Sequence, residues 1–520
     1  MPTESRIIRF IMWAAMAVLM GLWFHVYSQA YTAADTLWLA DAAGRLLNGE
    51  RMSESYYDPN PPLSIILYTI PALISKIGLL PIHMAVFYYT IAILTFMAFL
   101  LARIIKTVPQ SDNQTLFLCV AAFIIANTTL TAITFTERDQ ILGMALCPFV
   151  LTQVFITKKW ELPRWLLHTS LLCGAIFVLL KPHHGLLPTL ILLHRAISQK
   201  RIDLWKDADF IYLACGVLAY AALCLTYFKD YTFTILPDVL ALYSQTANPA
   251  IVKYYAHYVL IFAAVMVFGF FWNGRKISWP ATFFLACAII AFIPYVVQMR
   301  GYHYHMLPAV IFFTLGLTFT IRDIFKRFLN ADRAALATLI TIIALALNHY
   351  PLMFKFPTHQ EYRNFPISKI VEHCPAPCSL FMMNNTMEIA HQTAAYTGRQ
   401  WASRFPSIWF MPAIMQLMAQ GKLEEAAALR AKYGEMVGED FARYQPKLVL
   451  LAEFSVGSRG RKLNFAKFFS ESERFKEEWS KYRFVERVTI DQGVYFKGTA
   501  QDRTRHMTYQ IYERMEDATP

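Results

Sequence analysis

The chain has 520 residues, of which 56% are hydrophobic and only 16% are charged, and its mean hydropathy is +0.36. This composition excludes an ordinary soluble globular protein and predicts a polytopic membrane protein. The formal net charge of +12 does not indicate a nucleic-acid partner, because the Lys and Arg residues form no basic block and fall in short clusters between apolar runs.

The first apolar run, residues 7–28, is long enough to cross about 30 Å of hydrocarbon. Arg6 and Arg9 stand at its start, so we expect the N-terminus in the cytoplasm. No small-x-small cleavage site follows promptly, which favours an uncleaved anchor over a signal peptide. The polar segment that follows, residues 29–81, is then expected to be an outer loop.

Ten further apolar runs are candidate spans. They lie at about 83–104, 115–135, 139–157, 164–180, 185–197, 210–228, 255–272, 279–298, 304–321 and 333–350. If residues 62–80 lie along the membrane surface instead of crossing it, every loop expected on the cytoplasmic side carries basic residues, as the positive-inside rule requires. We therefore expect about eleven transmembrane helices. The weakest span is 185–197, whose alternative is a re-entrant hairpin.

The composition changes after residue 352. Residues 353–520 contain no run that could span a membrane. They combine an amphipathic helical pattern at 413–433 with short apolar runs, at 378–383 and 447–451, that are typical of buried strands. We expect a transmembrane module of residues 1–352, followed by a soluble α/β domain of residues 353–520 on the outer face.

Cys374 and Cys378 are the only two of the eight cysteines that lie outside apolar runs. A zinc site would need four ligands, and no second ligand cluster follows. A local disulfide in an oxidising compartment is the favoured interpretation, with two free thiols as the alternative.

Asp35 lies near the start of the outer loop and directly precedes a helical pattern that ends at Asn48-Gly49. Asp35 is therefore either a helix cap or a catalytic carboxylate. The loop closes on the sequence DPNPPL, in which Asp58 and Asn60 each precede a proline that favours an extended path. Both are candidate substrate-binding residues.

Three further polar groups fall at junctions between spans on the expected outer side. The first is Glu137-Arg138-Asp139, which is either part of a functional site or a salt-bridged turn. The other two contain cations and imidazoles: Lys181, His183 and His184, and then Arg300, His303 and His305. Outer-side cations oppose the positive-inside tendency, and a lipid-linked phosphate is an anion available at that depth.

These features resemble the GT-C glycosyltransferase superfamily, in particular the bacterial relatives of protein O-mannosyltransferases, aminoarabinose transferases and mycobacterial arabinofuranosyltransferases. The shared features are an outward Asp after the first span, a helix ending in LLNGE, the DPNPPL sequence, an acidic pair between the third and fourth spans, a Lys-Pro motif after the fifth and an outer C-terminal domain. The resemblance covers most of residues 1–310 and continues only loosely, through YTGRQWASRFPSIW.

By this resemblance, Asp35 matches the catalytic acid of the first outer loop, and Glu137 with Asp139 matches the second acidic motif. Lys181 and Arg300 fall where relatives hold the donor phosphate. The second motif reads ERD in this chain, which leaves open which of its two acids matters.

The resemblance implies an enzyme of the bacterial inner membrane that moves a monosaccharide from a polyprenyl-phosphate donor to an extracytoplasmic glycan, lipid or protein. A carboxylate such as Asp35 can accept the proton of the acceptor hydroxyl, while cations stabilise the leaving phosphate. A divalent metal ion, held by Asp35, Glu137 and Asp139 or assisted by the four histidines, is the one cofactor left open.

Two alternative functions remain. An O-antigen ligase or polymerase would use Arg and His residues of a late outer loop, such as residues 300–305. A lipid or sugar transporter would show paired repeats or ionisable residues in the middle of spans.

Overall fold

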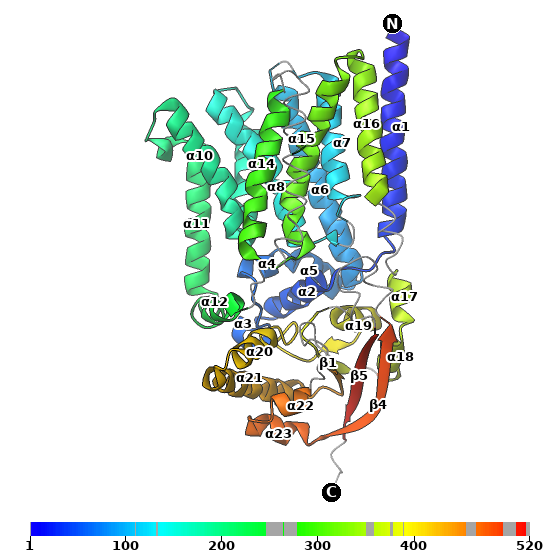
Figure 1. Cartoon of the computed structure of the whole chain (residues 1–520), viewed down its shortest axis with the longest axis vertical. Coiled ribbons are helices and arrows are strands. Elements are labelled where there is room, and N and C mark those ends of the chain that lie inside the picture. The colour runs from blue at the N-terminus through cyan, green and yellow to red at the C-terminus, as the bar shows by residue number, and fades with distance from the viewer. Residues whose placement is uncertain are drawn as a thin grey trace. The chain divides into compact units, whose positions relative to one another are not determined.

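The computed structural model describes residues 2–109, 111–131, 134–245, 264, 278–349, 358–374, 378–387, 389–453, 464–491 and 506–515. These residues are mainly helical (Figure 1). Their contacts divide them into two compact units. Unit 1 consists of Met1–Ser28, Phe87–Leu223 and Ala247–Phe354, and unit 2 of Gln29–Val86, Cys224–Thr246 and Lys355–Pro520. Unit 2 therefore combines the expected outer loop with the C-terminal region.

Long apolar helices build unit 1. They are α1 (Pro2–Tyr27), α6 (Ile82–Thr107), α7 (Asn113–Asn127), α8 (Arg138–Lys158), α9 (Arg164–Phe177), α10 (Leu186–Gln199), α11 (Ala208–Thr226), α14 (Trp279–Gln298), α15 (Leu307–Phe325) and α16 (Ala331–His349). Among the described residues, seven helices are long and apolar enough to cross a membrane. The chain is thus a helical multi-pass membrane protein, as its composition predicts.

Each expected span that falls within the described residues coincides with a helix, although the run at 115–135 forms only the 15-residue α7. The run at 185–197, the weakest candidate, forms the 14-residue α10 behind a short 3-10 helix, η3 (Pro182–Gly185). The run at 255–272 lies outside the described residues, and the number of about eleven transmembrane helices stays a prediction.

Helix α1 has two apolar faces with different surroundings. Ile8, Met12 and Met16, spaced four residues apart, are buried against α7 and α16. On the opposite side Phe10 and Trp13 are 74% and 63% exposed. A helix that is apolar all round suits a position between protein and lipid, so the exposed face is the one that lipid would cover.

Two buried arginines hold helix ends together in unit 1. Arg195 of α10 is fully buried and donates two hydrogen bonds, of 2.9 and 2.6 Å, to the two carboxylate oxygens of Asp209 at the start of α11. Arg322 of α15 donates to Asp112, whose carboxylate also caps α7 by accepting from the Thr115 N–H. Because a buried charge is tolerated only with a partner, each pair fixes how its helices meet.

Unit 2 contains shorter helices and a sheet. Its helical segments are α2 (Ala34–Leu47), α3 (Met52–Ser55), α4 (Pro62–Ile66), α5 (Thr69–Lys76), the π-helix η5 (Tyr231–Ile235), α12 (Leu236–Gln245), α17 (His359–Arg363), α18 (Pro366–His373), α19 (Ala390–Thr397), α20 (Met411–Ala419), α21 (Leu423–Tyr444), α22 (Phe465–Phe468) and α23 (Glu473–Trp479). The expected surface helix at 62–80 is therefore two short helices, α4 and α5.

The sheet of unit 2 has five strands in the order β2-β1-β3-β5-β4. The strands are β1 (Ser379–Met383), β2 (Gln400–Trp401), β3 (Leu448–Ala452), β4 (Tyr482–Asp491) and β5 (His506–Arg514). Strand β1 runs parallel to β2 and β3, and β5 runs antiparallel to β3 and β4. Every residue of β3 is buried, which explains why its sequence is a continuous apolar run without alternation.

One expected element is wrong. The sequence pattern predicts a single amphipathic helix at 413–433, but the structure contains two helices, α20 and α21, on either side of Gly421. Gly421 has a φ of +79°, a left-handed conformation that glycine adopts without strain and that commonly ends a helix.

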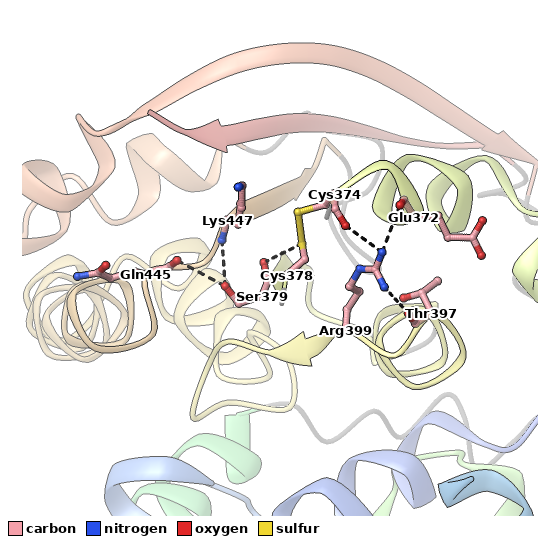
Figure 2. The surroundings of a disulfide bond; sticks show 8 residues. All are labelled: Glu372, Cys374, Cys378, Ser379, Thr397, Arg399, Gln445 and Lys447. Carbon is pink, nitrogen blue, oxygen red and sulfur yellow. Dashed lines mark hydrogen bonds between the residues drawn. A yellow bond between two sulfur atoms is a disulfide. The ribbon is translucent and has the colours of Figure 1, made fainter. Parts of the chain in front are cut away.

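Cys374 and Cys378 are bonded through their sulfur atoms, between the end of α18 and the start of β1 (Figure 2). The guanidinium of Arg399 donates to the carbonyls of Cys374 (2.9 Å) and Glu372 (3.2 Å) beside this bond. It also donates to the carbonyl of Thr397 at 2.6 Å. The last turn of α18 is thus attached both to β1 and to the chain that leaves α19.

Helices α14 and α15 approach closely at Gly316. A Cβ atom added at Gly316 would lie 2.7 Å from Cγ and 2.9 Å from the backbone nitrogen of Leu285. The backbone of α14 cannot move aside as a flexible side chain could. The lack of a side chain at residue 316 therefore permits this helix contact.

We expect Gly316→Ala to lower the free energy of unfolding by about 1–3 kcal/mol through overpacking, measured by thermal or denaturant unfolding in detergent. Gly21→Ala is the matched control, because a Cβ at Gly21 in α1 meets nothing within 4 Å. The control should be neutral or slightly stabilising. Equal effects of the two substitutions would contradict the close contact at Gly316.

Candidate active site

The predicted site residues divide between the two units. Asp35, Asp58 and Asn60 belong to unit 2, and all the others belong to unit 1. In unit 1 the structure brings together the start of α8, the turn around η3 and a 3-10 helix, η6 (His303–Met306), that precedes α15. We call the side chains that meet there the lysine cluster: Glu137, Arg138, Asp139, Lys181, His183, His184, Tyr304 and His305.

The first turn of α8 carries the three charged residues of the ERD sequence. Glu137 is the N-cap residue, and Arg138 and Asp139 are the first two helical residues. All three are buried, with exposures of 2%, 2% and 0%. Carboxylates suit this place because a helix N-terminus carries a partial positive charge.

Lys181 is the centre of the cluster. Its ammonium lies 2.8 Å from Oδ1 of Asp139, and both side chains are nearly withdrawn from water, at 8% and 0% exposure. The same ammonium lies 5.2 Å from the centre of the Tyr304 ring, a cation–π contact. Lys181 is extended, with φ −141° and ψ 90°, as a residue before proline prefers. The Lys181-Pro182 break between α9 and α10 therefore turns the lysine toward α8.

Three imidazoles, of His183, His184 and His305, lie near Lys181. His184 is 2% exposed, and its burial, with a smaller contribution from His183 and Lys181, holds the pKa of His184 well below its usual value. His184 is therefore neutral at physiological pH. The ring of His305 is 4.6 Å from that of Tyr304. His183 is exposed, and its Nε2 lies 2.8 Å from the amide nitrogen of Gln298.

Arg300 lies in the turn between α14 and η6. Met299 and Gly301 on either side of it have φ values of +49° and +73°, so the chain reverses sharply there, and Arg300 is partly exposed. His303 begins η6, and its side chain lies outside the part of the chain that the structure describes.

The lysine cluster combines two cations with the two carboxylates of Glu137 and Asp139. It holds two buried cations, Lys181 and Arg138, beside an imidazole that burial keeps neutral and able to donate a hydrogen bond without adding charge. Among the residues that the structure describes, no group of three or more His, Cys, Asp or Glu side chains is arranged to hold a metal ion.

In unit 2, Asp35 lies in the first turn of α2 and is partly exposed. The N-cap residue of this helix is Ala33, so Asp35 does not occupy the capping position. Asp58 is fully buried and accepts hydrogen bonds from the indole N–H of Trp38 and from the backbone N–H of Asn60. Both bonds join Asp58 to its own loop.

Sequence reasoning missed Arg45, which anchors α2. Arg45 is 8% exposed and donates to the carbonyls of Ser55 (2.5 Å), Trp401 (2.6 Å) and Ser403 (2.9 Å), and to the carboxylate of Asp41. Its position in the sequence could have indicated that Arg45 is buried. Arg45 lies seven residues, or two helical turns, after the buried Trp38 and therefore on the same apolar face of the helix.

A second arginine secures the segment that Arg45 contacts. Arg404 pairs with the fully buried Asp440 of α21 at 2.7 Å, and Asp440 also accepts from the Ser403 hydroxyl and the Arg404 N–H. The carbonyl of Arg404 accepts from the N–H of Tyr57 at 2.6 Å. The WASRF sequence, residues 401–405, is therefore held between α21 and the loop after α2.

Comparison with known proteins identifies the fold. No family model matches the chain, and no curated protein matches it in sequence. The chain is similar to the crystal structure of ArnT from Cupriavidus metallidurans bound to undecaprenyl phosphate, with a TM-score of 0.52 and 9% identity over 96% of this chain and 97% of that one. The apo structure of the same protein has a TM-score of 0.48 and 10% identity over 88% and 94%. The chain thus shares a fold with the lipid-bound structure over nearly its whole length.

The burial of the Lys181–Asp139 pair leads to a prediction about stability. Lys181→Met or Asp139→Asn alone should lower the free energy of unfolding by about 3–5 kcal/mol, because each leaves an uncompensated buried charge or polar group. The double variant should lose clearly less than the sum of the two, in a double-mutant cycle measured in detergent.

The exposed pair Arg51–Glu54, 4.0 Å apart with side chains 73% and 57% exposed, provides the matched control. Arg51→Met and Glu54→Gln should each change stability by less than about 0.5 kcal/mol. Additive losses at Lys181 and Asp139 would show that the two charges do not depend on each other.

Proposed function

We propose that this protein is a membrane glycosyltransferase that moves a monosaccharide from a polyprenyl-phosphate donor to an extracytoplasmic glycan, lipid or protein. The buried lysine pair, Lys181 with Asp139, carries this proposal, because it places a cation away from water beside the neutral imidazole of His184. The fold is similar to one crystallised with undecaprenyl phosphate. The resemblance of the sequence to GT-C glycosyltransferases supports the same reaction.

In the proposed site, Lys181 and Arg138 hold the donor phosphate, with Arg300 as a further cation. Charge-assisted hydrogen bonds to phosphate are stronger where water is excluded. They strengthen further as the phosphate leaves the sugar and gains charge, so the same contacts lower the barrier. His183, His184, His303 and His305 would add neutral donors, and His184 is buried in a form suited to this role.

Asp35 is the proposed general base. It accepts the proton of the acceptor hydroxyl while that oxygen attacks the anomeric carbon, and the bond from that carbon to the phosphate oxygen breaks. Asp35 is partly exposed on a helix held by buried hydrogen bonds from Arg45, as an accessible and well-positioned base should be. Asp139 already balances Lys181, so we assign Glu137 the second acidic role.

The proposed topology has the N-terminus in the cytoplasm and residues 353–520 outside the inner membrane. The disulfide between Cys374 and Cys378 supports it, because disulfides persist in oxidising compartments. A ligase would instead take a diphosphate-linked glycan, so purified protein should be offered polyprenyl-phosphate and polyprenyl-diphosphate sugars side by side. Transfer only from the diphosphate donor would reject the proposal.

Asp35→Asn should reduce turnover by about 10²–10⁴-fold, because an amide cannot accept the proton. Donor affinity and thermal stability should stay close to those of the native protein. Asp41→Asn is the matched control on the same helix, and it should retain most of its activity because Arg45 keeps three carbonyl acceptors. Native turnover by Asp35→Asn would move the base to Glu137.

Mass spectrometry of protein alkylated without reductant should find Cys374 and Cys378 linked to each other. The six remaining cysteines, all free in the structure, should be alkylated under denaturing conditions and serve as the internal control. Alkylation of both Cys374 and Cys378 in membrane-purified protein would remove the support for an outer C-terminal domain.

A further inference from the structure

The backbone just before α8 adopts an unusual conformation. Thr136 has a φ of +88°, a region that a β-branched residue rarely occupies. Of the other five non-glycine residues with positive φ in the described chain, four are the C-cap residues of helices, where a left-handed residue is common. Thr136 instead precedes a helix N-terminus, directly before the ERD sequence of the lysine cluster.

A buried side chain bonds to the backbone of the residue in this conformation. Gln140, in the first turn of α8, is 0% exposed. Its Oε1 accepts from the Thr136 N–H at 2.9 Å, and its Nε2 donates to the carbonyl of Asn127 at 2.5 Å. The amide therefore ties the end of α7 to the residue that leads into α8, using both of its ends.

We propose that Gln140 is a positioning residue for the lysine cluster, an inference that rests on the proposed function. By keeping Thr136 at positive φ, Gln140 sets the direction in which the chain begins α8. That direction decides where Glu137 and Asp139 lie, including the 2.8 Å approach of Asp139 to Lys181. Without the amide, Thr136 relaxes to negative φ and the first turn shifts.

Strain of this kind persists only where surrounding contacts enforce it, and it concentrates at functional sites. A side chain needed only to fill the core would require no positive φ beside it. Gln140 therefore either positions the backbone or only fills the core. Glycine at residue 136 distinguishes these roles, because glycine adopts positive φ without help. It should restore the activity of a Gln140 variant only if Gln140 positions the backbone.

The test compares four proteins: native, Gln140→Met, Thr136→Gly and the double variant. Gln140→Met keeps an unbranched side chain of similar length and removes both hydrogen bonds. We expect its kcat with a polyprenyl-phosphate sugar to fall about 10–100-fold, while the donor KM changes less than about threefold. Thr136→Gly alone should stay within about threefold of native kcat, and the double variant should recover most of the activity.

Gln153→Met is the matched control, because Gln153 is also a fully buried glutamine of α8 and donates to Asp209 and to the carbonyl of Pro188. Thr136→Gly should not rescue any defect of Gln153→Met. If Gln140→Met does not fold, Gln140→Leu with and without Thr136→Gly takes its place, because leucine also lacks both the acceptor and the donor of the amide, and the same two outcomes apply.

Native kcat in Gln140→Met, or a folded double variant that stays as slow as Gln140→Met, would overturn the positioning role. Either result leaves the proposed function intact, since the native protein is active in that experiment. A native protein that transfers no sugar from any polyprenyl-phosphate donor would instead reject the proposed function itself.

Discussion

A lysine ammonium and an aspartate carboxylate that meet away from water constrain one end of the helices of unit 1. Neither Lys181 nor Asp139 could be buried alone, because the loss of hydration would outweigh what packing returns. The break at Pro182 must therefore turn Lys181 toward α8, and the unusual backbone at Thr136 must lead α8 to meet it. The geometry of the proposed anion site is therefore also the geometry that satisfies these two charges.

In unit 2, Arg45 is likewise a buried charge that needs partners. Its guanidinium is satisfied mainly by backbone carbonyls, from Ser55, Trp401 and Ser403. Carbonyls are fixed by the fold of the chain that carries them, so Arg45 joins α2 to particular backbone positions and not to mobile side chains. The helix that carries Asp35 is thereby held by the C-terminal region, which is a structural part of the proposed site and more than an appended domain.

The sequence predicts the membrane class, most helix positions and the strands β1 and β3, because each of these depends on local hydrophobicity. It does not predict the break at Gly421, where one glycine conformation divides an otherwise continuous helical pattern. It also does not predict the burial of Arg45 and Arg195, because their partners lie elsewhere in the chain. The pairing of Lys181 with Asp139, 42 residues earlier, is likewise a tertiary contact that no spacing rule reveals.

The hydrogen bond from Arg45 to Trp401 spans 356 residues of sequence, and this separation has a consequence for biosynthesis. At about 5–20 residues per second, a ribosome needs roughly 20–70 s to deliver Trp401 after Arg45 has been made. During that interval α2 carries a guanidinium whose two most distant carbonyl acceptors, on Trp401 and Ser403, have not yet been synthesised. The arginine must stay hydrated meanwhile, so α2 can settle into its buried position only when translation of the C-terminal region is well advanced.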